Sequence, residues 1–251
     1  MNIKKIITVV IILVILIAAS AIFLAYKKNL VPTVLAPEQS TSLAIKDTQI
    51  TDNTKPFKID IVYPQIAGLD EFNQKAKTII EKEINDFKTN SLANDEAVKK
   101  VDPVAYAKYP REYDLNIGYD KGRVDENVVS IVFNVYNFEG GAHGASYFVP
   151  LNYDVKNKKE IALTDIFSNQ PDYLQKISSF CIADLTKQIT DKLGDTGGAW
   201  IQDGAGPVAD NFQFFLINPS TSSGQATLTF YFPQYQVAPG AAGDFQVTMP
   251  R

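Results

Sequence analysis

The clearest strand pattern of the sequence lies in residues 128–155, VVSIVFNVYNFEGGAHGASYFVPLNYDV. Val129, Ile131, Phe133 and Val135 occupy every second position, which is the period of a strand with one buried face. A segment with three glycines follows at 139–144, and a second run rich in apolar and aromatic residues covers 147–155. The stretch therefore predicts strands at 128–138 and 147–155 that are joined by a glycine loop.

Toward the N-terminus the same alternation predicts three more strands. Residues 113–119 form one of them, which a turn at Lys121–Arg123 would join to the 128–138 strand. Residues 57–63 form another, and residues 43–50 are a candidate hairpin partner for it. These strands extend the predicted antiparallel sheet.

Two stretches repeat apolar residues every three or four positions, the spacing of an amphipathic helix. The first begins at Asp70, and residues 91–110 after it are ambiguous because Pro103 interrupts any continuous helix. The second begins at Pro171 and stops at Gly194. Its apolar stripe comprises Leu174, Ile177, Cys181, Leu185 and Ile189.

Three further strands are expected after the second helix, at 212–217, 226–232 and 245–249. Strands and helices that do not alternate regularly favour an α+β fold, with antiparallel sheets and the two main amphipathic helices packed on them. One transmembrane helix is expected to precede this fold.

The predicted transmembrane helix covers Ile6–Ala25, twenty residues without a charge. A helix of that length spans about 30 Å, the thickness of the hydrocarbon core of a bilayer. A cleaved signal peptide is the alternative, but the apolar run continues past the small triplet at 19–21, which favours a retained anchor. We expect a single-pass membrane protein with its C-terminal domain outside the cytoplasm. Its predicted parts are the anchor (1–28), a linker (29–43), an N-terminal α+β subdomain (44–110) and a C-terminal subdomain (111–251).

Charge restricts the partners of the outer part. The chain has 24 Lys and Arg against 28 Asp and Glu, and Lys4, Lys5, Lys27 and Lys28 flank the apolar run. Without these four, 20 basic residues stand against 28 acidic ones, a net charge of −8. Such a surface repels nucleic acid and favours a basic protein.

Few residues in the sequence are suited to catalysis or metal binding. The one cysteine, Cys181, excludes an intramolecular disulfide, and the one histidine, His143, excludes a metal site with two imidazoles. The loop with Gly140, Gly141, His143 and Gly144 is interpreted as a structural connection, with phosphate binding and acid–base work as alternatives. We expect no catalytic residue, no cofactor and no metal.

Three residues are candidates for partner contacts. Trp200 lies in a glycine-rich segment that is predicted to be a long surface loop, where an indole either fills the core or anchors a partner. Pro233 and Pro239 bracket Tyr235 and restrict its backbone, which suits a structural corner or a binding anchor. Trp200, Pro233 and Tyr235 are therefore the predicted contacts.

The order of these motifs resembles a known family of bacterial envelope proteins. The matching segments are Ile61-Val-Tyr-Pro-Gln-Ile66, Ser130-Ile-Val-Phe133, Glu139-Gly-Gly-Ala-His-Gly144, Asn152-Tyr-Asp154, Leu163-Thr-Asp-Ile-Phe167 and Phe230-Tyr-Phe-Pro-Gln-Tyr235. Together they resemble the RsiV-type extracytoplasmic domain, a domain of unknown function. Its N-terminal part is similar to the module before the catalytic domain of PdaC-type peptidoglycan deacetylases.

The resemblance implies a membrane-tethered outer domain, which in RsiV-type anti-sigma factors recognises lysozyme. Only Met1–Lys5 precede the span, so we expect no sigma-binding segment, and no deacetylase domain is expected either. The leading hypothesis is a binding or sensor module for a basic, lysozyme-like protein or a cell-wall ligand. An enzyme that modifies wall glycans through His143, or a structural envelope protein, are the alternatives.

Overall fold

The computed structural model describes residues 41–108, 111–194, 198–220 and 226–250. The predicted membrane anchor at Ile6–Ala25 and nearly all of the predicted linker lie outside these residues. Among the helices of the described part, none combines the length and the apolar composition that crossing a membrane requires.

The first layer is a six-stranded sheet in the order β1-β2-β3-β4-β5-β6. Its strands are β1 (Ile45–Asp52), β2 (Phe57–Ile66), β3 (Tyr113–Val124), β4 (Val128–Phe138), β5 (Ala145–Asp154) and β6 (Lys159–Glu160). Strands β2 and β3 pair in parallel and all other neighbours pair antiparallel. The strands predicted along this half of the chain are thus found, in one sheet.

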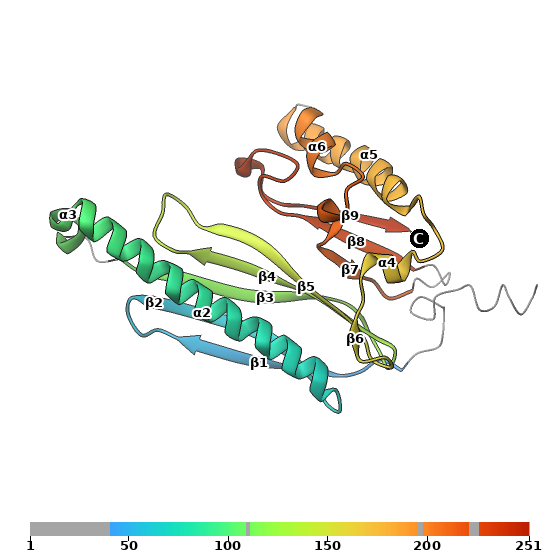
Figure 1. Cartoon of the computed structure of the whole chain (residues 1–251), viewed down its shortest axis with the longest axis horizontal. Helices are drawn as coiled ribbons and strands as arrows, with labels where there is room; N and C mark the ends of the chain where they lie inside the picture. Colours follow the sequence, from blue (N-terminus) through green and yellow to red (C-terminus); the bar gives the residue numbers. More distant parts are fainter. Residues whose placement is uncertain (1–40, 109–110, 195–197, 221–225, 251) are drawn as a thin grey trace, which may run out of the picture.

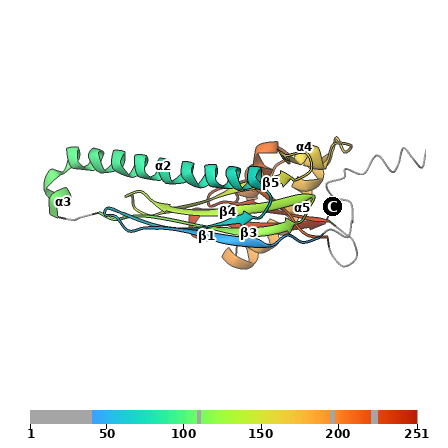
Figure 2. The ribbon, with the colours of Figure 1, turned by 90° about the horizontal axis from the view of Figure 1, so that it is seen from below.

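A long helix, α2 (Asp70–Val101), covers one face of this sheet and carries the chain from β2 to β3 (Figures 1 and 2). A parallel pair needs such a crossover, whereas a two-residue hairpin suffices for an antiparallel pair. Phe72, Ala76, Ile80 and Phe87 turn toward the sheet and form one buried cluster with its strands. The short helix α3 (Pro103–Lys108) follows, so that Pro103 begins a helix of its own.

Tyrosine hydroxyl groups of the sheet also form hydrogen bonds with carboxylates of α2. Tyr147 donates a hydrogen bond to Glu83, and Tyr113 donates one to Asp95. Burial, followed by the bond to Asp95, raises the pKa of Tyr113 to about 12. Both effects favour the neutral phenol in the folded protein.

We predict that the free energy of unfolding falls as the pH rises from about 10 toward 12, because an unfolded tyrosine loses its proton near pH 10. Folded Tyr113 keeps its proton up to about pH 12, so the unfolded state binds fewer protons in this range. Urea denaturation between pH 9 and 11.5 measures this slope. The Tyr113→Phe variant should show a shallower decline, and equal slopes for the two proteins would contradict the prediction.

The second layer is a three-stranded antiparallel sheet in the order β7-β8-β9. It comprises β7 (Phe215–Ile217), β8 (Thr227–Phe232) and β9 (Phe245–Pro250). Helix α5 (Tyr173–Leu193) packs on this sheet through the predicted stripe of Ile177, Cys181, Leu185 and Ile189. It ends at Gly194 in the left-handed conformation (φ 71°), as its glycine predicts.

We call the six-stranded sheet with α2 and α3 the first module, and the three-stranded sheet with its helices the second module. Three short helices complete the second module. They are α4 (Leu163–Ile166), α6 (Gly198–Gly204) and η2 (Ala209–Phe212), and the 3-10 turn η3 (Gly240–Ala242) precedes β9. The described residues thus form the mixed α+β fold expected from the sequence.

Buried hydrogen bonds join the two sheets. The Ser130 hydroxyl on β4 donates to Asn152 Oδ1 on β5 (2.6 Å) and accepts from the backbone N–H of Ile217 on β7 (2.7 Å). Asn152 Nδ2 donates to the carbonyl oxygen of Phe215 (2.9 Å). Since both polar side chains are buried, each depends on these partners.

Four details differ from the sequence prediction. The predicted antiparallel sheet contains one parallel pair, β2 with β3, because helix α2 carries the chain back before β3 begins. The predicted turn at Lys121–Arg123 is wrong: β3 continues to Val124, and the turn comes at Asp125–Asn127, where Asp125 Oδ1 accepts the backbone N–H groups of Asn127 and Val128. Helix α2 continues to Val101 through residues that were ambiguous. Strand β2 extends through Pro64 to Ile66.

The predicted subdomain boundary between residues 110 and 111 falls within the first sheet. Strands β2 and β3, from opposite sides of this boundary, pair from Phe57 with Tyr113 to Ile61 with Ile117. The two main hydrophobic clusters follow the sheets and not this boundary. One lies between α2 and the first sheet, and the other lies between α5 and the second sheet. The division into subdomains at 44–110 and 111–251 stays a prediction.

Candidate functional site

Two strands run outward from the junction between the modules. At the junction Val132 of β4 and Phe148 of β5 pack with Leu216 and Tyr231 of the second module. The ring centroids of Phe148 and Tyr231 are 4.9 Å apart. From here β4 leads to the β4–β5 hairpin tip and β8 leads to the β8–β9 loop, and Figure 1 shows both tips on the same side of the molecule.

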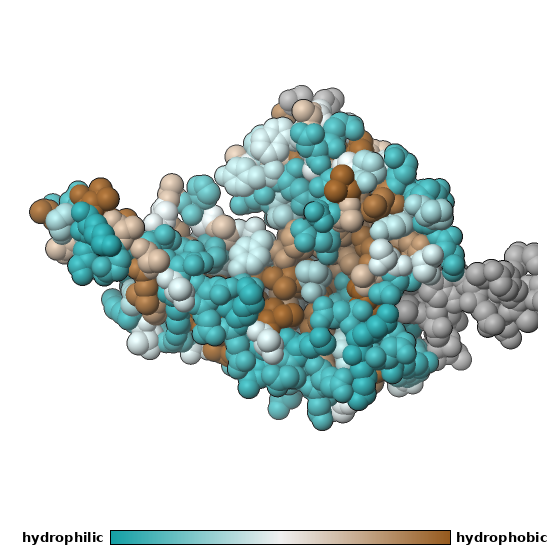
Figure 3. Space-filling view, viewed as in Figure 1, coloured by the Kyte–Doolittle hydropathy of each residue, from teal (hydrophilic) through white to brown (hydrophobic). Residues whose placement is uncertain are grey.

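The surface is hollowed between these tips (Figure 3). We call this recess the notch, with the β4–β5 hairpin (residues 133–149) as one wall and the β8–β9 loop (residues 233–244) with α6 as the other. The face of β4 opposite α2 lines the notch, because Tyr136 and Val132 share one side of the strand and alternate with residues of the α2 cluster.

Tyr136 on the first wall is an exposed aromatic ring supported by a glycine. Its side chain is 42% exposed although β4 is paired on both sides here, with Asn116 and with Ser146. A Cβ atom added to Gly144 would lie 2.5 Å from ring atoms of Tyr136. The ring therefore lies directly on the backbone of the glycine loop, and only glycine leaves room for it.

Tyr235 on the second wall repeats this arrangement. It is 55% exposed, and a Cβ atom added to Gly240 would lie 2.1 Å from its ring. Its backbone has φ 71°, the left-handed conformation that tyrosine rarely adopts. Both tyrosines are thus held in place while exposed, so a ligand would meet rings whose freedom is already restricted. Pro233, at the start of the same loop, is half-buried.

Trp200 lies on α6, which contacts the Tyr235 loop. The indole is 42% exposed, so it does not fill the core. Gln236 Nε2 donates to the carbonyl oxygen of Gly204 (2.8 Å), and a Cβ atom at Gly204 would lie 1.9 Å from the carbonyl oxygen of Gln236. The segment predicted as a long surface loop is therefore partly helical and buries Ile201 and Phe212.

The walls of the notch are strongly biased in charge. Residues 124–155 contain four acidic residues and no lysine or arginine, and the same is true of residues 193–250. The lysines and arginines of the chain lie elsewhere. Within the walls themselves the charged residues are Glu139, Asp203 and Asp244, and Lys192 of α5 is a nearby cation, with its ammonium 5.1 Å from the Phe245 ring centroid. Acidic residues thus outnumber this lysine around the notch, which favours a cationic ligand.

The glycine loop has structural roles on the face that packs against α2. Gly140 has φ 88°, and a Cβ atom there would lie 2.8 Å from the Tyr113 ring. His143 is exposed, and its Nδ1 lies 2.9 Å from the carbonyl oxygen of Gly144. A cavity of about 360 Å³ lies beside it, between the loop and α2. No hydrogen bond or ion pair joins His143 to a carboxylate among the described residues. Gly141 contacts little besides its own loop.

The structure does not bring the one thiol and the one imidazole together. Cys181 is buried in the α5 cluster of the second module, and burial raises the pKa of its thiol to about 12. His143 lies at the hairpin tip of the first sheet. Within the described ranges no group of three or more His, Cys, Asp or Glu side chains is placed to hold a metal ion.

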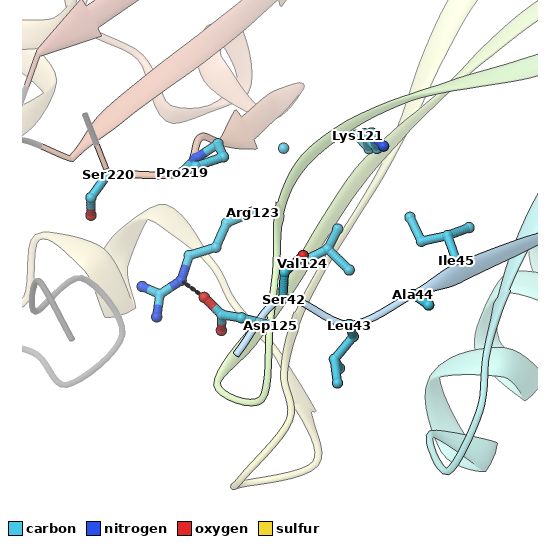
Figure 4. Close-up of a pocket in the computed structure, with 11 residues that line it drawn as sticks. Ser42, Leu43, Ala44, Ile45, Lys121, Arg123, Val124, Asp125, Pro219 and Ser220 are labelled. Carbon is cyan, nitrogen blue, oxygen red and sulfur yellow. Dashed lines mark hydrogen bonds and ion pairs between the residues drawn. The ribbon is translucent and has the colours of Figure 1, made fainter. Parts of the chain in front are cut away.

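Another cavity, of about 670 Å³, lies at the other end of the first sheet, beside the β3–β4 turn (Figure 4). Its lining includes Leu43, Lys121 and the buried ion pair of Arg123 with Asp125. The exposed aromatic residues are absent from its lining, and it is distinct from the notch.

Sequence reasoning missed Tyr136 as a candidate contact. Ile131, Phe133 and Val135 mark the buried phase of the strand, so Tyr136 falls on the other phase, where a polar residue is expected. The sequence does hold one indication of an exposed contact residue: an aromatic residue on the outward face of the strand, with a glycine near its cross-strand partner. Tyr136 pairs with Ser146, two residues beyond Gly144.

Comparison with known proteins divides the chain in two. The profile of the family described as Deacetylase PdaC matches residues 50–146, and that of the protein family of unknown function DUF3298 matches residues 164–251. The peptidoglycan-N-acetylmuramic acid deacetylase PdaC of Bacillus subtilis is 27% identical over 202 residues. That match covers 80% of this chain and only 39% of the deacetylase.

Two solved structures share the fold. A DUF3298 family protein from Bacteroides fragilis is 20% identical with a TM-score of 0.50, and one from Pseudomonas aeruginosa is 14% identical with a TM-score of 0.53. In each case the match covers 84% of this chain and 92% of the other. The predicted likeness to the PdaC-type module is confirmed, whereas the RsiV-type assignment stays a prediction.

Proposed function

We propose that this protein is a non-enzymatic binding module of the bacterial cell envelope, which recognises a basic, lysozyme-like protein at the notch. One observation carries the proposal. Three exposed aromatic side chains, Tyr136, Trp200 and Tyr235, stand on walls whose segments contain acidic residues and no lysine or arginine. Aromatic residues are enriched among the residues that dominate binding energy at protein interfaces.

The surroundings of the site support binding over catalysis. Both tyrosines are fixed on glycines, an arrangement that lowers the entropy cost of binding. A general acid–base role for His143 needs a partner within hydrogen-bond reach, and its Nδ1 lies against the backbone carbonyl oxygen of Gly144. The peptidoglycan-related name of the similar deacetylase supports a place in the cell envelope. The anchor at Ile6–Ala25 would hold the domain outside the cytoplasm.

Salt dependence is the first test. We expect the full chain, purified in a mild detergent, to bind a basic lysozyme, with weaker binding at 500 mM than at 50 mM sodium chloride because salt screens exposed charges. Isothermal titration calorimetry measures both affinities, with an acidic protein of similar size as the control. Absence of binding at low salt would refute the lysozyme proposal.

Replacing Trp200 with alanine should weaken the complex about tenfold and leave the thermal midpoint of unfolding unchanged. The indole is 42% exposed, so its loss removes contact area from the interface and little from the core. Trp200→Phe is the matched variant and should keep most of the affinity. An unchanged affinity in Trp200→Ala would remove α6 from the proposed site.

A further inference from the structure

Strand β5 has one unpaired edge along most of its length. On one side it pairs with β4 over all ten residues, from Ala145 to Asp154. On the other side β6 pairs only with Tyr153 and Asp154. Within the described ranges no strand therefore pairs with the outer side of residues 145–151.

The hydrogen-bonding groups on this edge follow from strand geometry. The Asn152 carbonyl accepts a bond from the Ile161 N–H on the β6 side, so Asn152 directs its backbone groups outward. Every second residue of a strand directs its backbone groups to the same side. Ser146 and Phe148 thus each offer an N–H and a C=O, and Pro150 offers a C=O alone.

The composition of this edge is unusual for an exposed strand. Residues 145–153, ASYFVPLNY, contain no charge, whereas the other edge of the sheet, β1, carries Lys46, Asp47 and Asp52. Charged residues and prolines are the usual protection against unwanted strand pairing. Asp154 of β5 lies where β6 pairs, and within residues 145–153 the only such residue is Pro150, near the module junction. The edge toward the hairpin tip therefore lacks this protection.

The unprotected edge lies in the notch. Ser146 is the cross-strand partner of Tyr136, and Phe148 packs against Tyr231 at the junction. A strand added beside β5 would therefore run along the β4–β5 wall next to the Tyr136 ring. Main-chain hydrogen bonds would supply affinity, and alternate side chains of the added strand would face the aromatic residues.

We propose that the β5 edge at Ser146 and Phe148 captures an extended segment of the partner protein as an additional strand. This inference rests on the proposed function and specifies how the notch holds its partner. A protein segment fits because only a polypeptide backbone offers alternating donors and acceptors at the strand spacing. Because acidic residues predominate on the notch walls, we expect basic side chains to flank this segment.

The Ser146→Pro variant tests the edge directly. Proline removes the outward N–H of residue 146, and the ladder to β4 is retained because that N–H faces away from β4. Ser146→Ala removes the same hydroxyl and keeps the N–H, which makes it the matched control. With a basic lysozyme as the probe, we expect Ser146→Pro to bind at least tenfold more weakly than Ser146→Ala, at equal thermal midpoints.

A second measurement covers the case in which Ser146→Pro fails to fold. In the unsubstituted full chain, the Phe148 amide should exchange with deuterium at least tenfold more slowly when the lysozyme is bound. Equal affinities of the two variants, or an unchanged Phe148 exchange rate in a saturated complex, would overturn strand addition alone and leave the proposed function standing. No lysozyme binding by the unsubstituted chain would overturn the proposed function and this inference with it.

Discussion

Replacing Gly122 with alanine should lower the free energy of unfolding by about 3 kcal/mol, the upper part of the range for overpacked interiors. Gly122 lies on β3 where β7 crosses it, and an added Cβ would be 2.2 Å from the Ile217 carbonyl oxygen and 2.8 Å from the Leu216 side chain. Because the nearest atom is a backbone oxygen, a change of side-chain rotamer cannot relieve the clash. The two sheets would have to separate locally.

Gly118 provides the control on the same strand. It lies four residues from Gly122, and a Cβ atom added to it would meet no atom within 4 Å. Gly118→Ala should therefore unfold at a urea midpoint close to that of the unsubstituted protein. If Gly122→Ala were as stable as Gly118→Ala, the close contact between β3 and β7 would be disproved.

The double variant Tyr136→Ala/Tyr235→Ala should lose about a thousandfold in affinity for a basic lysozyme. Each ring is exposed and fixed on a glycine, and truncation of a dominant aromatic contact costs about 2 kcal/mol or more, roughly thirtyfold. The two tyrosines stand on opposite walls of the notch, so we expect their effects to multiply. Calorimetric titration of both single variants and the double variant measures this directly.

Two controls separate this loss from a general effect. Leu92, on α2 against the opposite face of the sheet, is 49% exposed, and Leu92→Ala should bind as the unsubstituted chain does. Tyr136→Phe keeps the ring and should keep most of the affinity. Full affinity in the double variant, together with normal binding by the unsubstituted chain, would place the partner elsewhere on the surface.

Local patterns were sufficient to predict most secondary structure. The strand alternation around Phe133 and the helical stripe around Cys181 each reflect one buried face, and a buried face imposes its period on the sequence. Gly194 marked the end of α5 because the left-handed conformation favours glycine. These signals are contained within a few neighbouring residues.

The candidate site was only partly predictable, because it depends on contacts between distant segments. Gly122 resembles a turn residue in the sequence, and its role becomes evident only once β7 lies across β3. Trp200 and Tyr235 were identified as candidates from their residue types, but the glycine under Tyr235 and the link from Gly204 to Gln236 are tertiary features. The open β5 edge depends on how far β6 extends, which no local pattern specifies.

Hydroxyl-radical footprinting of the full chain with and without a basic lysozyme tests the central claim most directly. We expect Tyr136, Trp200 and Tyr235 all to be oxidised less in the saturated complex, while Leu92 is oxidised equally in both samples. Unchanged oxidation of the three aromatic residues in a saturated complex would show that the partner binds outside the notch and would contradict the account.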